Sequence, residues 1–174
     1  MSALQDAAGR LALPAGAPPN FDPRQVAALD QVIARGQIPQ ALTLYRGRAR
    51  RMSLAEARSE VGTVIIDHGY VSTSLAPAVA ESFAGWQHSY TFGVNQEITN
   101  RRVQAGTLYQ ITIPAGSRGA FVDAQQTGRA EYEIVLPRGS QFLLTGVSQR
   151  PIAGLPLGAY TVLHLELLPP EPAP

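Results

Sequence analysis

The sequence contains no cysteine among its 174 residues. This absence excludes a disulfide framework and thiolate catalysis, and it removes the usual ligands of structural zinc sites. Charged residues are scarce, at 16%, and the formal net charge of +1 gives no electrostatic basis for binding nucleic acid or a membrane surface. No stretch approaches the roughly eighteen apolar residues that cross a bilayer. The three histidines, His68, His88 and His164, lack the spacing of metal ligands, so we expect no metal.

The two ends of the chain differ in composition from its middle. Residues 1–20 are rich in Ala, Pro and Gly, which predicts a flexible tail or linker and also fits a cut within a longer polypeptide. Residues 169–174 form a second, Pro-rich tail. Between them we expect one folded domain over residues 21–168, long enough to bury a core. The N-terminus shows no ordinary secretory signal, so export would need a dedicated machine or a removed leader.

The first half of the sequence predicts helices interspersed with short strands. Apolar residues recur at helical spacing between Asp22 and Gly36, and Ser53 with Glu56 forms a capping box for a second helix. The predicted elements are helices over 22–36, 53–60 and 77–83, and strands over 42–47 and 70–74.

The second half predicts strands separated by Gly and Pro breakers. A polar stretch over 87–106 precedes them, and we interpret it as an extended loop or helical insert. Because helices come first and closely spaced strands follow, the predicted fold class is α+β with a largely antiparallel sheet. The strands are expected over 107–113, 119–123, 131–136, 141–148 and 161–167.

Three polar sites lie at the ends of predicted strands, where side chains are free to meet a ligand. Arg46 follows an apolar strand, and a guanidinium suits bidentate binding of phosphate oxygens, while Gly47 allows close approach to the main chain. The segment 72–74 reads Ser-Thr-Ser, whose hydroxyls can orient a carboxylate or a ligand. Two alternatives remain open: an ordinary surface arginine after a strand, and hydroxyls that only cap the following helix.

The third site is the pair Glu131 and Glu133, one residue apart at the head of an apolar strand. Side chains alternate along a strand, so both carboxylates are expected on one face, roughly 6–7 Å apart and able to act on one ligand. The alternative is a half-buried strand with a solvated face.

The order of these sites resembles the mono-ADP-ribosyltransferases of the Arg-Ser-Glu clade. That family includes clostridial binary-toxin enzyme components, injected bacterial effectors, polymorphic-toxin tips and vertebrate ecto-enzymes. The resemblance covers residues 21–167 and implies a helical N-terminal part packed on a split, largely antiparallel β-sheet core with an NAD cleft. The matching segments are Leu44-Tyr45-Arg46-Gly47, Tyr70-Val71-Ser72-Thr73-Ser74, and 131–142, which begins Glu131-Tyr132-Glu133.

The resemblance implies NAD as the substrate and assigns residues to its binding. Arg46 matches the arginine that contacts the NAD phosphates, and Gly47 matches the neighbour whose main chain holds the nicotinamide amide. Phe83 falls where the family often places an aromatic against the nicotinamide ring. For Phe83 the alternative is the apolar face of the 77–83 helix.

The same resemblance implies the catalytic set. Ser72 matches the serine that positions the catalytic glutamate, which is Glu133. Ionised Glu133 would stabilise the oxocarbenium-like centre from which nicotinamide leaves. Glu131 matches the residue that selects the acceptor, and a glutamate there points to arginine, whose guanidinium needs a nearby carboxylate to become a nucleophile.

Two stretches depart from the family pattern. The acceptor-recognition loop, 123–130, lacks the aromatic residue often found there, and Gln125, Gln126 and Arg129 are expected to replace it. The 87–106 insert is longer than in many members, and we expect it to bind a target or an inhibitor. Its pair of arginines, Arg101 and Arg102, is interpreted as solvated surface.

The predicted function is therefore NAD-dependent ADP-ribosylation of arginine in a target protein by a toxic effector domain. Such a domain would be secreted or injected, would act in the target-cell cytoplasm and would face an immunity or inhibitor protein. Three alternatives stay open. They are an NAD glycohydrolase, a transferase acting on structured RNA, and a catalytically silent binding module.

Overall fold

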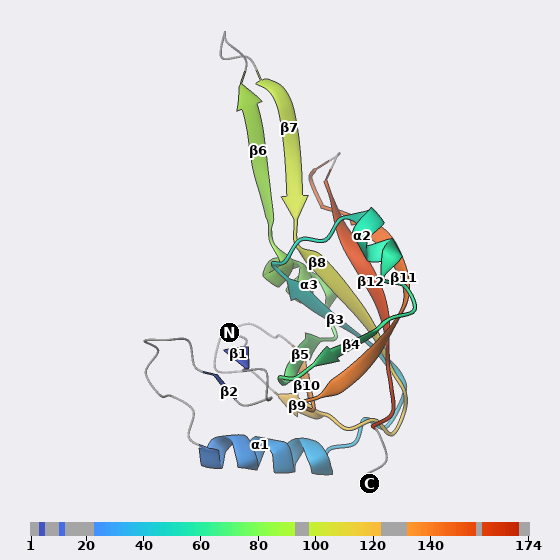
Figure 1. Cartoon of the computed structure of the whole chain (residues 1–174). Coiled ribbons are helices and arrows are strands. Elements are labelled where there is room, and N and C mark those ends of the chain that lie inside the picture. The colour runs from blue at the N-terminus through green and yellow to red at the C-terminus, as the bar shows by residue number, and fades with distance from the viewer. Residues whose placement is uncertain are drawn as a thin grey trace.

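The centre of the fold is an eight-stranded sheet in the order β4-β11-β12-β8-β3-β5-β10-β9, shown in a computed structural model of the chain (Figure 1). The structure describes residues 4–5, 11–12, 23–92, 98–122, 132–155 and 158–170. Its helices are α1 (Pro23–Arg35), α2 (Leu54–Ser59) and α3 (Pro77–Ala84). Its strands are β1 (Leu4–Gln5), β2 (Leu11–Ala12), β3 (Leu42–Arg48), β4 (Val64–Asp67), β5 (Val71–Ser74), β6 (Trp86–Phe92), β7 (Ile98–Ala105), β8 (Thr107–Ile113), β9 (Ala120–Val122), β10 (Glu133–Leu136), β11 (Ser140–Pro151) and β12 (Ala159–Leu167).

The central sheet is largely antiparallel and divides into two parts. Among its described strands, β8 and β12 alone pair in parallel. Strands β3 and β5 are joined by a single register pair, Tyr45 with Ser74, whereas β3 and β8 pair over seven residues. This narrow junction separates β5-β10-β9 from the larger part, so the predicted α+β class with a split sheet is confirmed.

Three clusters of buried apolar side chains hold the layers together. The main core lies between the two parts of the sheet and includes Leu44, Ile111, Ile134 and Leu136. A second cluster joins α3 to β8 and β12, and a third joins α1 to β9 and β10. The second contains Ala80, Ala84, Leu108, Ile152, Tyr160 and Val162; the third contains Ile33, Ala120 and Val135.

Each helix begins and ends within one residue of its predicted bounds. The capping box of α2 is present: the Glu56 N–H donates to Ser53 Oγ at 3.1 Å, and the Ser53 N–H donates to Glu56 Oε2 at 3.4 Å. Helix α1 turns Ile33 into the third cluster but leaves Val32 56% exposed, so its apolar face is narrower than the sequence pattern indicates.

Glycines let the helices approach the sheet closely. A Cβ at Gly47 would lie 1.8 Å from the main-chain oxygen of Ala80, so α3 packs directly against β3. At the end of α1, a Cβ at Gly36 would lie 2.0 Å from the main-chain oxygen of Gly119. At these contacts glycine supplies space for another backbone.

The interpretation of residues 87–106 as a loop or helical insert is wrong. Strands β6 and β7 pair antiparallel from Trp86 with Ala105 to Phe92 with Ile98. Figure 1 shows this hairpin projecting away from the central sheet. Ring-bearing residues do recur at every second position from Trp86 to Phe92, which is the strand period, but one of them is His88 and the residues between them are polar, so the apolar alternation is weak.

Strand β4 was not predicted from the sequence. It lies at the edge of the sheet, paired with β11 alone among the described strands, and Val64 and Ile66 are each 48% exposed. A short edge strand buries little and therefore gives a weak pattern.

The predicted tails are described only in part. Within residues 1–20, β1 and β2 form a short antiparallel pair, and residues 171–174 lie outside the described residues. No helix in the described part of the chain has the length and apolarity needed to cross a membrane.

Candidate active site

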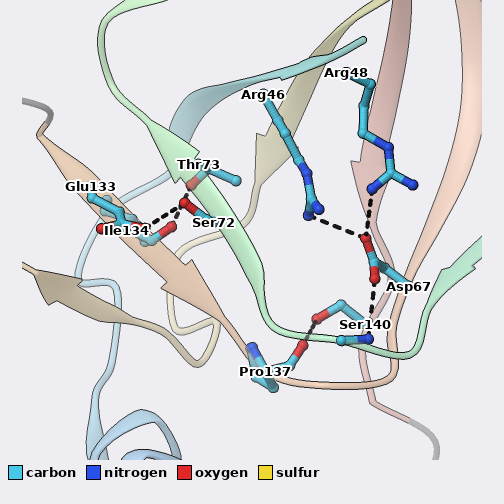
Figure 2. A network of polar contacts seen from close by, with 10 residues as sticks. Arg46, Arg48, Asp67, Ser72, Thr73, Glu133, Ile134, Pro137 and Ser140 are labelled. Atoms are coloured by element: carbon cyan, nitrogen blue, oxygen red, sulfur yellow. Dashed lines mark hydrogen bonds and ion pairs between the residues drawn. The ribbon is translucent and has the colours of Figure 1, made fainter. Parts of the chain in front are cut away.

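Strands β5 and β10 bring a hydroxyl and a carboxylate together. They pair antiparallel with Ser72 opposite Val135 and Ser74 opposite Glu133. Alternation therefore places Ser72 and Glu133 on the same face, diagonal to one another. Ser72 Oγ donates a hydrogen bond to Glu133 Oε1 (Figure 2). This hydrogen bond fixes the direction of the Glu133 carboxylate.

The other two hydroxyls of the Ser-Thr-Ser segment have structural partners. Thr73 faces the core, is 4% exposed and donates from Oγ1 to the main-chain oxygen of Ile134 at 2.6 Å. Ser74 Oγ accepts from the Ala76 N–H at 3.0 Å, which shapes the turn into α3. Helix α3 has its N-cap at Ala76, without a side-chain cap hydrogen bond, so the alternative of hydroxyls that only cap this helix does not hold.

Arg46 contacts a carboxylate that the sequence did not suggest. Its side chain is 8% exposed, and NH1 lies 3.1 Å from Oδ2 of Asp67, the last residue of β4. Arg48 NH1 lies 3.6 Å from the same oxygen, and Figure 2 shows both arginines directed at Asp67. Burial lowers the pKa of Arg46, while the charge of Asp67 acts in the opposite direction.

Arg46 has hydrogen-bonding capacity to spare for a ligand. NH1 of Arg46 forms an ion pair with Asp67, yet this buried nitrogen has no hydrogen-bond partner in the described part of the chain. A buried donor without a partner is unfavourable and would be satisfied by a phosphate oxygen. Such a donor suits an anionic ligand with strong acceptor oxygens.

Arg46 has no recorded contact with the Ser72–Glu133 pair among the described residues. In Figure 2 the ribbon of β5 runs between the guanidinium of Arg46 and that pair. The structure thus joins Ser72 to Glu133 and joins Arg46 to Asp67. The sequence analysis did not predict Asp67 as a site residue because it did not predict β4. The apolar run Val64-Ile65-Ile66, directly before Asp67, could have indicated this strand.

The remaining predicted residues have different surroundings. Gly47 meets α3 where a side chain would lie, so packing alone requires glycine there. Phe83 is 60% exposed, and the buried face of α3 consists of Ala80 and Ala84, so the alternative of a core phenylalanine is wrong. Glu131 and the predicted recognition loop, 123–130, lie outside the described residues.

The strand that carries Glu133 begins later than predicted. Strand β10 starts at Glu133, and Tyr132 before it has a φ of 46°, in the left-handed region that L-residues rarely adopt. The prediction of a strand over 131–136 is therefore wrong at its start. Period-2 alternation gives no ground for placing Glu131 on the face of Glu133.

The described residues contain no group of three or more His, Asp or Glu side chains arranged to hold a metal ion. They do form a cavity of about 610 Å³ at another place, between the turns 114–118 and 137–141 and the segment 167–170. None of the predicted site residues lines it.

Comparison with known proteins identifies a family and a fold. A family model described as ADP-ribosyltransferase exoenzyme matches residues 16–152. Among solved structures, the chain is similar to C3larvin toxin, an ADP-ribosyltransferase from Paenibacillus larvae, with a TM-score of 0.57 and 16% identity over 87% of this chain and 75% of that one. The Clostridium limosum C3 exoenzyme gives a TM-score of 0.57 and 16% identity over 84% and 68%.

A third similar structure is the ADP-ribosylating toxin BECa of a C. perfringens binary enterotoxin, solved with NADH. Its TM-score is 0.57 at 12% identity, over 87% of this chain and 37% of that one. At such identities the likeness shows the fold. A comparison with curated protein sequences found no match.

Proposed function

The chain belongs to the ADP-ribosyltransferase exoenzyme family, and on that basis we propose that it transfers ADP-ribose from NAD to an arginine of a target protein. The observation that carries this proposal is the hydrogen bond from Ser72 to Glu133. It joins two residues that lie 61 positions apart in the sequence and holds one acidic side chain in a fixed direction at a strand end.

Glu133 is the catalytic residue of the proposed reaction. The bond between the nicotinamide nitrogen and the ribose C1′ breaks, its electron pair leaves with nicotinamide, and positive charge develops on the ribose. The ionised carboxylate of Glu133, near that ribose, stabilises this charge. Ser72 acts through Glu133 by keeping the carboxylate in one orientation.

Arg46 binds the NAD phosphates in this proposal. Its unsatisfied buried NH1 supports the assignment, since a phosphate oxygen is a strong acceptor for a guanidinium. Phe83, largely exposed on α3, is available to contact the nicotinamide ring. The main chain of Gly47 holds the nicotinamide amide, as the family resemblance implies.

Glu131 selects arginine as the acceptor. A guanidinium nitrogen of the target attacks C1′, and the proton it loses passes to the Glu131 carboxylate. The support for this step is the sequence pattern Glu131-Tyr132-Glu133, because Glu131 lies outside the described residues.

We place the protein as an effector or toxin domain that is secreted or injected and modifies a protein in the target-cell cytoplasm. The support is the family, together with toxins among the similar structures. A producing cell would need an immunity or inhibitor protein if the target were shared.

One experiment tests the function. The protein is incubated with labelled NAD and a target-cell lysate, and the modified residue is located by mass spectrometry. Wild type should label protein on arginine, and Glu133→Gln should abolish labelling while retaining most NAD binding. Label removed by RNase would assign RNA as the acceptor, and NAD loss without any labelled macromolecule would assign a glycohydrolase. NAD binding without turnover would indicate a silent module.

A further inference from the structure

Two arginines converge on one carboxylate oxygen next to the candidate site. NH1 of Arg46 and NH1 of Arg48 lie 3.1 and 3.6 Å from Asp67 Oδ2 (Figure 2). Two residues apart on β3, they share one face of the strand. The two arginines and Asp67 together carry a net charge of +1. Asp67 therefore neutralises only one of the two positive charges.

The two arginine side chains differ in how far they are buried from solvent. Arg46 is more than nine-tenths buried, and its NH1 has no hydrogen bond among the described residues. Arg48 is 38% exposed and lies over the ring of Tyr109, with Cζ 5.7 Å from the ring centroid. Tyr109 is also the register partner of Arg46 on β8, so the same ring borders both arginines. An anion arriving from solvent would meet Arg48 first and Arg46 behind it.

Asp67 uses its two oxygens differently. Oδ1 accepts from the Gly69 N–H at 3.1 Å and shapes the turn after β4, whereas Oδ2 faces the two arginines. One oxygen thus serves the local backbone, and the other supplies the negative charge between the guanidinium groups.

We propose that Arg46 and Arg48 form a two-arginine site for a diphosphate group, and that Asp67 is its internal counter-ion, replaced at the guanidinium groups by the ligand. The identification of that diphosphate with the one in NAD rests on the proposed function. The family resemblance assigns only Arg46, so Arg48 and Asp67 are additions from this structure.

This arrangement predicts opposite effects of Asp67→Asn on binding and stability. The variant keeps Oδ1 as an acceptor for Gly69 but raises the charge of the cluster from +1 to +2, so an anion should bind about fivefold more tightly. The fold should be less stable, because Arg46 then stays buried without its counter-charge. A carboxylate that only organised the arginines would give weaker binding together with lower stability.

The experiment is titration calorimetry of the full chain with inorganic pyrophosphate and with ADP-ribose at low ionic strength, with melting temperatures measured in parallel. We expect tighter binding and a lower melting temperature for Asp67→Asn. Arg48→Gln, at a partly exposed position, should bind both ligands about tenfold more weakly with a small change in melting temperature. Asp30→Asn is the matched control, because it removes the carboxylate of the Asp30–Arg138 pair elsewhere in the fold. It should lower the melting temperature without changing either affinity.

The inference is overturned if Asp67→Asn binds pyrophosphate no more tightly than wild type, or if Arg48→Gln binds it as well as wild type does. These results are separable from a failure of the proposed function. Labelling of a target with unchanged affinities would reject only the two-arginine site. The expected affinity changes without NAD cleavage would support the anion site and reject the transferase.

Discussion

Ser72 and Glu133 lie diagonally across the β5–β10 pair and are joined by a hydrogen bond from the serine hydroxyl to the carboxylate. The next residue, Thr73, points to the opposite face and bonds the main-chain oxygen of Ile134 in the core. Two adjacent hydroxyl groups in one four-residue strand therefore have different roles. One orients an acidic side chain at the surface, and the other stabilises the sheet beneath it.

Ser72→Ala should reduce kcat of the proposed transfer and leave stability nearly unchanged. Misplacement of a catalytic group can cost up to about a hundredfold in rate, so loss of this orienting bond predicts roughly a tenfold to hundredfold decrease in kcat. Affinity for NAD should change little, because Ser72 acts through Glu133. Steady-state kinetics gives the split between kcat and KM, and a change confined to KM would contradict the positioning role.

Thr73→Val should show the reverse pattern. It removes the donor to the Ile134 oxygen at a position that is 4% exposed, and the loss of one intramolecular hydrogen bond costs about 0.5–1.5 kcal/mol. Urea denaturation should reveal this loss of unfolding free energy, with kcat close to that of wild type. Equal losses of activity in both variants would indicate a general collapse of the site.

Gly47→Ala should destabilise the fold by about 1–3 kcal/mol, the usual cost of overpacking. The added methyl group would lie 1.8 Å from the Ala80 oxygen, so α3 would have to move away from β3. Gly69→Ala is the control, because the nearest atom to its Cβ, Asp67 Oδ1, would be 3.5 Å away. Denaturant midpoints that fell equally for both variants would argue against the close approach of α3.

Elements with a strong local signal were predictable from the sequence. The strand over 107–113 was predicted with the bounds that β8 has, because its apolar residues are bounded by Gly and Pro. The capping box of Ser53 and Glu56 likewise specifies α2 through two local hydrogen bonds. In both cases the determining interactions lie within a few residues.

Features that depend on distant partners were not predictable in the same way. The exposed edge strand β4 gave a weak pattern, and Asp67 was lost with it. The pairing of Arg46 with Asp67 is a tertiary contact that sequence order does not encode. The contact between Ser72 and Glu133 was expected only because the order of motifs resembled a known family, and their catalytic roles stay predictions.

Glu131→Gln should separate hydrolysis from transfer. If Glu131 prepares the acceptor guanidinium, the variant should still release nicotinamide from NAD while transfer to arginine is suppressed. Nicotinamide release and arginine labelling are measured on the same samples. Glu133→Gln is the control and should lose both activities. Arginine labelling at the wild-type rate in the Glu131 variant would remove its assigned role.

The contact of α1 with the sheet should respond to pH through one polar cluster. Asp30 on α1 accepts from Tyr70 Oη at 2.6 Å and from Arg138 Nε at 3.1 Å, and Arg138 also lies over the Tyr70 ring. Burial alone would raise the pKa of Asp30, but these hydrogen bonds and the charge of Arg138 together hold it below the ordinary value of 3.8. Burial and the bond to Asp30 raise the pKa of Tyr70 to about 12.

At the acid end, a carboxylate with a lowered pKa stabilises the fold above its unfolded pKa of about 3.9, and this contribution is lost as the pH falls through the folded value. Asp30→Asn lacks the contribution at every pH. The melting temperature of wild type should therefore exceed that of Asp30→Asn at pH 7, and the difference should shrink below about pH 4. A difference that stayed constant between pH 7 and the acid limit would contradict the lowered pKa.

At the alkaline end, stability is lost as the pH rises instead of as it falls. A phenol with a raised pKa contributes stability that is complete below its unfolded pKa of about 10 and is lost as the pH rises through the folded value of about 12. Tyr70→Phe has no such group, so the advantage of wild type over Tyr70→Phe should fall between pH 10 and 12. Tyr160, whose pKa burial also raises, provides the control: it is present in both proteins, so its titration cancels in the comparison. If the advantage of wild type persisted unchanged to pH 12, the hydrogen bond to Asp30 would not be the contact that holds α1.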